Sequence, residues 1–304
     1  MSVRDEINDY NLRFEALSIP KLLDIKVSGK TVTGTIIDDS YTDIKIPDFI
    51  THIARTSLGM TTGKELVRTE SVKLGKEVKV IAKNVFSSAI NLKEIYGLEN
   101  VETIGDAAFW GCDSLKSINL ANAKKIGNMA FSKCIGLENI EFGTNLVEIG
   151  RSAFYGCNKL DSVKLPDGLK VLWVSAFENC DWLRRVEIPQ SLFQIHESAF
   201  EGCVSLESVT FYGESDTKHY PYIHHYAFKD CYSLREFIVP DYIGMIGRCA
   251  FLNCEKLEHI VIGKGVTTIE EEAFVGCKSL KTVHLKSKKI KDISIFGNAE
   301  VIRC

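Results

Sequence analysis

Thiol groups are the most numerous candidates for chemistry in this chain of 304 residues, which carries ten cysteines. Cysteines in this number ordinarily suggest zinc ligands or disulfides. A zinc site needs four ligands that converge, usually arranged in C-x-x-C pairs. Apart from Cys249 and Cys254, neighbouring cysteines here lie 18 or more residues apart. The spacing therefore argues against a metal site built from thiols.

Eight of the ten cysteines occupy the fifth place of an eight-residue sequence that recurs along the chain. This octet has the form A-F-x-x-C-x-x-L. Its first complete copy is AFWGCDSL at Ala108–Leu115, and its last is AFVGCKSL at Ala273–Leu280. A worn copy, VFSSAINL, occupies Val85–Leu92. The phenylalanines of the complete copies follow one another at 22, 23, 23, 23, 28, 23 and 23 residues. A fixed period in this range predicts a solenoid in which each repeat forms one coil.

The letters of one repeat predict the course of one coil. Ala, Cys and Leu of the octet recur at helical spacing, so we expect a short helix there. An alternating segment follows each octet, as in Ser117–Leu120, and predicts a strand that buries every second side chain. A shorter extended segment, such as Val101–Gly105, leads into the next octet. Stacked coils would bury the apolar faces of one another.

Stacking also predicts the state of the thiols. The octet cysteines would form a line of side chains about 4.8 Å apart. Disulfides need Cβ atoms about 3.5–4.5 Å apart with converging bonds. We therefore expect the octet cysteines to be reduced, and to be buried as small hydrophobic side chains. Cys304 and, as a second choice, Cys249 are the candidates for an exposed, reactive thiol.

The combined pattern L-x-x-I-x-L-P … I-G-x-x-A-F-x-x-C-x-x-L resembles the BspA-like leucine-rich repeat family, and the resemblance covers roughly Ile44 to Leu285. It implies an α/β repeat solenoid, a curved right-handed stack of about ten coils with a parallel sheet on one face and capped ends. It also implies a protein-interaction role, often at cell surfaces, without catalytic residues.

Domain organisation follows from the extent of the repeat. We expect an N-terminal helical cap at residues 1–31, with its helix at residues 2–18. The solenoid would span residues 32–285, including a degenerate first coil at residues 32–70 that carries an insertion, Gly59–Glu70. Residues 286–304 would form a C-terminal partial coil or cap. End coils need such caps because they otherwise expose an apolar cross-section.

Charge and hydropathy argue against several classes of partner. The net charge is −3 and no run of five like charges occurs, which argues against nucleic acid or an anionic membrane. No apolar stretch approaches the roughly 20 residues of a membrane helix. The first residues lack the apolar core of a secretory signal. We expect a cytoplasmic protein, or a surface or secreted one if a signal peptide has been removed, and we expect no cofactor.

Three consecutive coils carry bulky rings at a place that Gly occupies in several other coils. Trp173, His196 and His224 stand there, and coils in register would stack them on one outer face. Three interpretations are open: a tolerated surface ladder, a stripe that binds a partner, and a metal site formed by His196, Glu197, His224 and His225.

The 28-residue coil carries its extra residues within Gly213–Tyr222, either as a neutral insertion or as a recognition loop. In the coils after this insertion, the outward-facing residues of the alternating strand segments change from small or charged residues to apolar and imidazole side chains. We therefore hypothesise that a partner docks on the C-terminal third of the chain. The residues of this hypothesis are Tyr220, Tyr222, Ile238, His259, Val261 and His284.

These observations favour a non-catalytic protein-binding module whose partner is a protein. Two alternatives are a cell-surface adhesin-type repeat protein and a metal-binding protein that uses the His-rich region. Self-association through an end coil is a further alternative, because it would also cover an uncapped apolar surface.

Overall fold

The computed structural model describes residues 27–28, 31–32, 42–46, 48, 50–53, 68–214 and 221–304. It divides into two compact units, Met1–Asn145 and Leu146–Cys304. The helix expected at residues 2–18, most of the insertion expected at Gly59–Glu70, and Tyr220 lie outside the described residues. In the part of the chain that the structure describes, no helix has the length and apolar character needed to cross a membrane.

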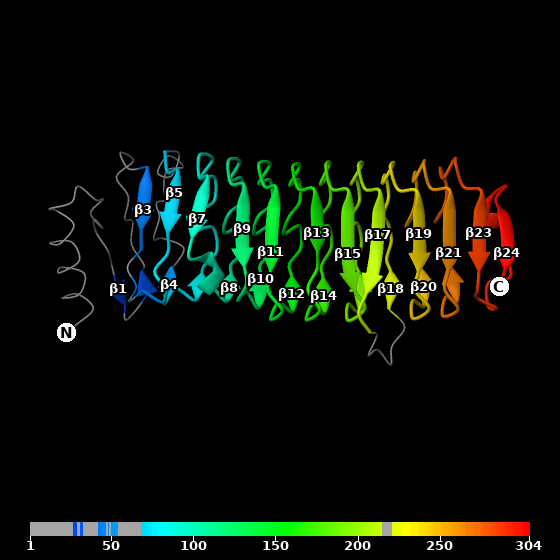
Figure 1. Ribbon diagram of the computed structural model, residues 1–304, viewed down its shortest axis with the longest axis horizontal. Coiled ribbons are helices and arrows are strands. Elements are labelled where there is room, and N and C mark those ends of the chain that lie inside the picture. Colours follow the sequence, from blue (N-terminus) through cyan, green and yellow to red (C-terminus); the bar gives the residue numbers. More distant parts are fainter. Residues whose placement is uncertain are drawn as a thin grey trace. The chain divides into compact units, whose positions relative to one another are not determined.

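Coils of the first unit contribute longer and shorter strands, which form separate sheets (Figure 1). The longer strands are β3 (Asp43–Lys45), β5 (Ser71–Lys73) and β7 (Glu94–Tyr96) in one sheet, and β9 (Ser117–Leu120) and β11 (Asn139–Phe142) in another. The shorter strands β2 (Thr31–Val32), β4 (His52–Ile53), β6 (Val80–Ile81), β8 (Thr103–Ile104) and β10 (Lys125–Ile126) pair in parallel. β1 (Val27–Ser28) adds to β2 in the antiparallel sense, and η1 (Leu98–Asn100) is a single 3-10 turn.

The second unit repeats this plan with parallel pairing throughout. Its longer strands form a three-stranded sheet of β13 (Ser162–Lys164), β15 (Arg185–Pro189) and β17 (Ser208–Tyr212), and a four-stranded sheet of β19 (Glu236–Val239), β21 (His259–Ile262), β23 (Thr282–Leu285) and β24 (Glu300–Arg303). Its shorter strands are β12 (Glu148–Ile149), β14 (Val171–Leu172), β16 (Gln194–Ile195), β18 (Tyr222–Ile223), β20 (Met245–Ile246) and β22 (Thr268–Ile269). A 3-10 turn, η2 (Ser294–Phe296), precedes β24.

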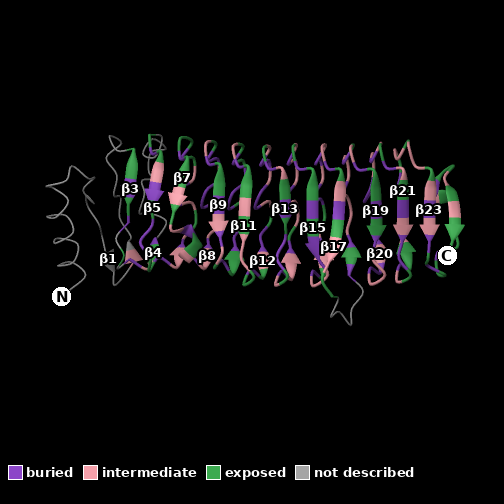
Figure 2. Ribbon diagram, in the orientation of Figure 1, coloured by how far each residue is buried: buried purple, intermediate pink, exposed green. Residues whose placement is uncertain are grey.

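The in-register pairing of the parallel strands explains why the same residue type recurs at the same position of successive coils. Val186 pairs with Val209 across β15 and β17, and Ile260 pairs with Val283 across β21 and β23. These inward side chains are buried, whereas residues between them on the longer strands are more exposed (Figure 2). Each buried letter therefore contacts its own copies. The predicted parallel-sheet repeat solenoid is confirmed, with about nine turns.

The octets are not helical, and the expectation of a helix in each coil is wrong. No α-helix occurs in the described residues, and each octet is a succession of turns. Two places in every octet region have positive φ, directly before the Ala and directly before the Cys, as in Ala107 (φ 50°) and Gly111 (φ 68°). Left-handed residues cannot continue a right-handed helix. The coils are therefore built of strands and turns rather than of alternating helices and strands.

Hydrogen bonds between coils hold the octet turns in place. The main-chain N–H of Phe109 donates to the carbonyl of Ala130 across 2.7 Å, and that of Gly111 donates to Ser132 across 2.9 Å. Equivalent bonds recur between octets of the second unit. In a helix these amides would bond within one octet, whereas here they link one coil to the next.

The phenylalanine rings of the octets form a buried ladder. In the first unit Phe86, Phe109 and Phe131 stack with centroid separations of 4.9 and 5.0 Å. In the second unit the octet rings from Phe154 onward stack at 5.0 to 5.6 Å. Phe296 of η2, which the repeat pattern does not identify, packs on the last octet ring at 5.3 Å. It closes the core of the final coil.

All ten cysteines are free thiols and all lie in the described residues. The octet cysteines are buried except Cys277, which is partly exposed, so the prediction of a reduced, buried ladder is confirmed in the main. Cys249 is also buried, so the expectation of an exposed thiol there is wrong, and its Sγ donates to Glu272 at 3.2 Å. Cys304 is exposed.

Candidate partner-binding surface

A row of apolar and imidazole side chains crosses the outer face of the four-stranded sheet. Ile238 of β19 pairs with Val261 of β21, Val261 pairs with His284 of β23, and His284 pairs with Ile302 of β24. Ile238 is 57% exposed and Ile302 is 38% exposed, while Val261 and His284 are partly buried. The structure thus brings three of the predicted residues into one row. Ile302 was missed, although it alternates with the inward Val301.

His259 lies on the same face of the sheet in a neighbouring row. It is exposed and pairs in register with Glu236 of β19 and with Thr282 of β23. This second row is polar, so it borders the apolar row as a rim borders an interface.

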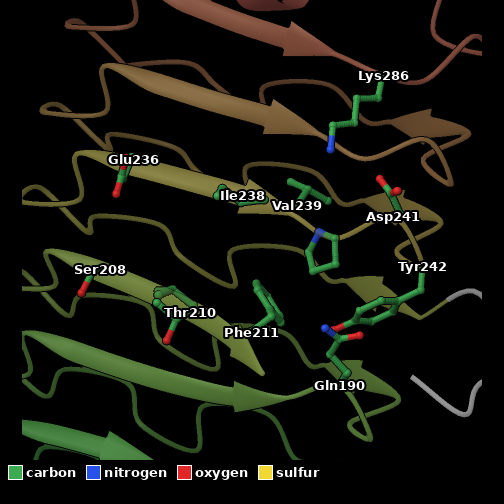
Figure 3. A pocket seen from close by; sticks show the side chains of 12 residues that line it. Gln190, Ser208, Thr210, Phe211, Glu236, Ile238, Val239, Asp241, Tyr242 and Lys286 are labelled. Carbon is green, nitrogen blue, oxygen red and sulfur yellow. The ribbon is translucent and has the colours of Figure 1, made fainter. Parts of the chain in front are cut away.

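A break in the long-strand sheet lies beside Ile238. β17 and β19 are consecutive long strands, but they belong to different sheets and no main-chain ladder joins them, although both are fully described. An open groove of about 480 Å³ lies here, lined by residues of β17 and β19 and by Gln190, Asp241, Tyr242 and Lys286 beyond the strand ends. Figure 3 shows the groove running along the strands, with Ser208 and Thr210 on one side and Glu236 and Ile238 on the other. Its volume is in the range of ligand pockets.

A large inward ring accompanies this break. Phe237 of β19 stands at the place that Ile260 takes in β21. Its ring meets Phe228 and Phe251 at 5.0 and 4.8 Å and the edge of Phe211 at 5.9 Å. Phe237 is buried, so its ring fills the interior of this coil where the neighbouring strand has a β-branched residue.

One end of the groove is polar. Asp241 accepts a hydrogen bond from the main-chain N–H of Lys264 at 3.1 Å and pairs with its Nζ at 3.3 Å. Burial alone would raise the pKa of Asp241, but the hydrogen bonds from Lys264 and the charge of Lys286 outweigh it and hold the pKa below its usual value. Burial raises the pKa of Tyr242, so its hydroxyl stays protonated and can donate. This end therefore offers a carboxylate that is already paired and a neutral donor.

The rings of Trp173, His196 and His224 stack directly after the shorter strands of the second unit. Their centroids are 5.1 and 5.0 Å apart, with interplanar angles of 21° and 8°. Tyr222 meets His224 edge-on at 5.8 Å. Burial lowers the pKa of both imidazoles, so both are neutral near pH 7. Tyr222 belongs to this ladder on the short-strand sheet, and the structure does not bring it together with Ile238 on the long-strand sheet.

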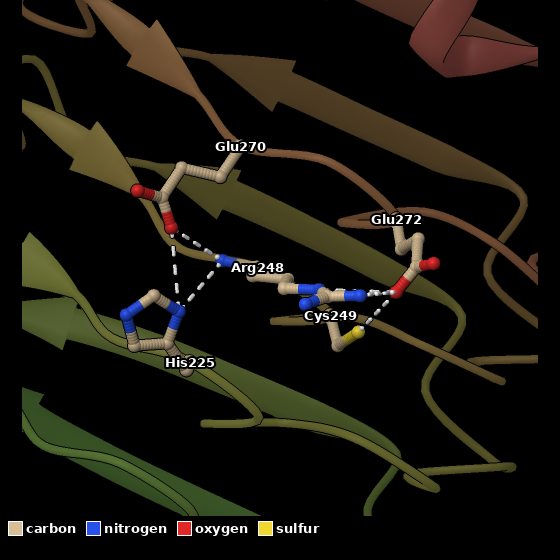
Figure 4. A network of polar contacts seen from close by, with 5 residues as sticks. All are labelled: His225, Arg248, Cys249, Glu270 and Glu272. Carbon is tan, nitrogen blue, oxygen red and sulfur yellow. Dashed lines mark hydrogen bonds and ion pairs between the residues drawn. The ribbon is translucent and has the colours of Figure 1, made fainter.

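His225 takes part in a separate polar network (Figure 4). Its Nδ1 accepts from the main-chain N–H of Arg248 at 3.1 Å and lies 3.3 Å from Glu270 Oε2. The same N–H also donates to Glu270 at 2.9 Å. Arg248 and the thiol of Cys249 both donate to Glu272. The imidazole is therefore held by its neighbours in the next coils.

The described residues contain no group of three or more His, Cys, Asp or Glu placed to hold a metal ion. The imidazoles of His196 and His224 lie face to face, so their ring nitrogens lie in nearly parallel planes and do not converge on one point. A tetrahedral metal needs converging lone pairs. This geometry gives no support to the metal-site interpretation.

Comparison with known protein families matches this chain to the BspA type leucine-rich repeat region, over residues 38–123, 56–181, 121–221 and 214–300. Among solved structures the chain is similar to a leucine-rich repeat protein from Bacteroides ovatus, with 24% identity, coverage of 94% of this chain and 91% of that chain, and a TM-score of 0.60. It is also similar to a leucine-rich cell surface protein from Faecalibacterium prausnitzii, with 19% identity, coverage of 88% and 96%, and a TM-score of 0.41. None of the curated proteins matches it. These similarities concern the fold alone.

Proposed function

Because the chain belongs to the BspA-type leucine-rich repeat family, we propose that it is a non-catalytic module that binds a protein partner. One observation carries the proposal: Ile238, Val261, His284 and Ile302 stand in register on the outer face of the four-stranded sheet. Apolar surface in water is unfavourable, and a contiguous patch of it marks an interaction site. The repeat scaffold supports this role, because stacked coils hold such a row rigidly.

The row has the composition of an interface. Ile238 is the most exposed large apolar side chain of the four-stranded sheet, at 57%. His284 supplies a flat ring beside Val261, and His259 and Glu236 give the polar border. An apolar centre with a polar rim is the usual anatomy of a surface that binds a protein.

The test is a matched pair of double variants. Ile238→Ser with Val261→Ser should weaken capture of the partner at least tenfold, roughly 1.4 kcal/mol. Lys164 and Glu187 occupy the same outward place on β13 and β15 and form an ion pair at 3.2 Å. Changing both of these to Ser should leave capture unchanged.

Partner capture would be quantified by pull-down from the native organism and then with the purified partner. Circular dichroism and thermal melting would report folding of each variant. Equal capture by both double variants, or a collapse of folding in the Ile238 and Val261 variant, would rule out this row as the interface.

We further propose that the protein works in a reducing compartment, the cytoplasm. Ten free cysteines, with an exposed thiol at Cys304, support this proposal, because disulfides accumulate in oxidising compartments. An adhesin-type protein at the cell surface is the competing proposal for the same family. Fractionation of the native organism separates the two, and recovery from the outer surface would overturn the cytoplasmic one.

A further inference from the structure

The coil that ends in β24 is shorter than the coils before it. His259 pairs in register with Thr282, 23 residues later, whereas Thr282 pairs with Glu300, only 18 residues later. β24 follows β23 at one end of the four-stranded sheet (Figure 1). The segment between these two strands contains η2, but it contains neither a short strand nor an octet. The coil of β24 therefore has no octet to cover the octet Ala273–Leu280.

Main-chain donors of the octet Ala273–Leu280 are left without acceptors. In each preceding octet of the second unit three amides, at alternate residues, donate to carbonyls of the next octet, as Phe251 N–H does to Ala273 across 2.9 Å. The equivalent amides here are those of Glu272, Phe274 and Gly276. In the described part of the second unit, no group accepts a hydrogen bond from these three amides.

An open pocket of about 520 Å³ lies over these donors, and we call it the last-coil pocket. All three donor residues line it, and residues of η2 line its other side. Val275, which also lines it, is 54% exposed, and Cys277 is partly exposed, unlike the buried cysteines of the preceding octets. Phe296 of η2 packs on Phe274 at 5.3 Å. η2 therefore fills the place of an octet ring and leaves the rest of the octet's place open.

The spacing of the donors selects the kind of ligand. Nests that bind a small anion use successive amides, whereas these three amides belong to alternate residues and follow a line. Between earlier octets the matching acceptors are main-chain carbonyls, also at alternate residues. Main-chain bonds of this kind give a bound peptide its affinity, and contacts of its side chains give specificity. The donors are therefore complementary to a polypeptide segment.

A second copy of this chain is a poor source of that segment. The octets from Ala176 onward already give the matching carbonyls to the coil before them. These carbonyls are not free to accept from another molecule. The complementarity therefore favours a segment of a different protein.

We propose that the last-coil pocket binds a segment of the protein partner, which adopts the octet conformation and completes the coil of β24. Carbonyls of the segment accept from the amides of Glu272, Phe274 and Gly276, in the register found between earlier octets. This inference rests on the proposed protein-binding function and adds a second contact, at the end of the stacked octets.

The pocket and the earlier octets define the sequence of the segment. A small residue is needed where an octet has its ring, because Phe296 already packs on Phe274. The residue after it is apolar, since it covers Val275. Glycine comes next, because the place directly before the Cys has positive φ in every octet, as at Gly276 (φ 78°). A hydroxyl or thiol at the last place can donate to the carbonyl of Phe274, as Cys277 does to the carbonyl of the preceding octet phenylalanine.

The first experiment measures amide hydrogen exchange by NMR in the free protein. The amides of Glu272, Phe274 and Gly276 lack acceptors, so they should exchange at least tenfold faster than the equivalent amides of the preceding octet. The equivalent amides are those of Cys249, Phe251 and Asn253. Equal protection of the two sets would mean that the chain itself covers the donors, and would overturn the proposal.

The second experiment uses a synthetic probe, the acetylated and amidated peptide Ser-Ser-Ala-Ala-Val-Gly-Ser. Its second Ala stands at the place of the octet ring, and binding should slow exchange of the three amides at least tenfold. Phe in place of that Ala should weaken binding at least tenfold, because Phe296 occupies the place. Val in place of Gly should weaken it similarly, because the place needs positive φ. Absence of binding at millimolar peptide, or equal binding of the three peptides, would overturn the proposal.

A pair of variants tests the position of the pocket. Val275→Lys should weaken binding of the peptide at least tenfold, because it puts a charge where an apolar residue must pack. Ile293 belongs to the same short coil, is 42% exposed and does not line the pocket, so Ile293→Lys is the matched control. The control should leave binding unchanged, and thermal melting would report folding of both variants. Equal effects on binding would contradict the assignment of the pocket.

The source of the segment and the proposed function are tested separately. Sedimentation of the full chain should show no self-association that depends on Val275. Self-association that Val275→Lys abolishes would identify a second copy as the occupant and overturn the assignment to a different protein. Loss of partner capture on changing Ile238 and Val261, which lie on the sheet face, would still support protein binding if the peptide failed.

Discussion

The thiol of Cys180 donates a hydrogen bond to the main-chain carbonyl of Phe154 in the preceding coil, across 3.3 Å. The same bond recurs between other octets, at 3.1 to 3.3 Å. The carbonyl of Phe154 also accepts from the main-chain N–H of Cys157 at 3.2 Å, and its oxygen has a second lone pair that the thiol satisfies. Cys is therefore more than a small hydrophobic side chain here, because it fills a constant volume and also supplies a second donor to this carbonyl.

This bond predicts different effects for two substitutions of Cys180. Cys180→Ala removes the donor and leaves a small cavity, so it should lower the free energy of unfolding by about 1–3 kcal/mol. Cys180→Ser keeps a hydroxyl donor and should lose less. Urea denaturation of the two variants measures the difference. Equal losses would mean that the thiol acts by volume alone.

The thiols also predict a pattern of chemical reactivity. Burial raises the pKa of Cys112, Cys180, Cys231 and Cys254 well above the usual value, and raises that of Cys277 to about 12. Thiolate is the reactive form, so these groups should resist alkylation in the native protein. Titration with a thiol reagent should find one fast group, Cys304, and ten groups after denaturation. A native protein that loses fast labelling on Cys304→Ser would confirm the assignment, whereas several fast groups would contradict it.

The ring ladder predicts a large cost for one truncation. Phe177 is fully buried and stacks on Phe154 and Phe200 at 5.0 and 5.6 Å. Phe177→Ala should lower the free energy of unfolding by about 3–5 kcal/mol, because both stacking partners lose contact and a cavity remains. Trp182 is 61% exposed and is the matched control. Trp182→Ala should change stability by no more than about 0.5 kcal/mol. Comparable losses in the two variants would show that the ladder does not carry the stability.

The sequence alone predicts the repeat and the residues that each coil buries, and the reason is physical. Each buried letter packs against copies of itself in the coils on either side, so Phe, Cys and Leu recur at a fixed period. The outward letters follow by alternation, which is why Ile238 and Val261 could be placed side by side in advance.

The failures concern features that one repeat does not determine. The spacing of Ala, Cys and Leu fits a helix, but the positive φ at Ala107 and Gly111 turns the octet into linked turns whose amides bond to the next coil. The sequence also does not predict the missing ladder between β17 and β19, because main-chain pairing depends on how the coils stack.

The stacked imidazoles predict a loss of stability in mild acid. Burial lowers the pKa of His196, and burial together with the charges of His196 and His225 lowers the pKa of His224. The unfolded chain therefore binds more protons than the folded one between these lowered values and about 6.5. The contribution of the ladder to stability is complete above about pH 6.5 and falls as the pH drops through the lowered pKa values.

Replacing both imidazoles by phenyl rings tests this linkage. His196→Phe with His224→Phe keeps the stack between Trp173 and Tyr222 but removes the titrating groups. Urea denaturation would measure the free energy of unfolding at about pH 7.5 and about pH 5.5. The fall between the two pH values should be smaller in the variant than in the wild type, because only the wild type has imidazoles whose pKa is lowered by folding. Trp173 fluorescence should change in the same pH range in the wild type alone, since a protonated imidazole would lie against the indole. Equal pH dependence in the two proteins would mean that the ladder does not control the acid response.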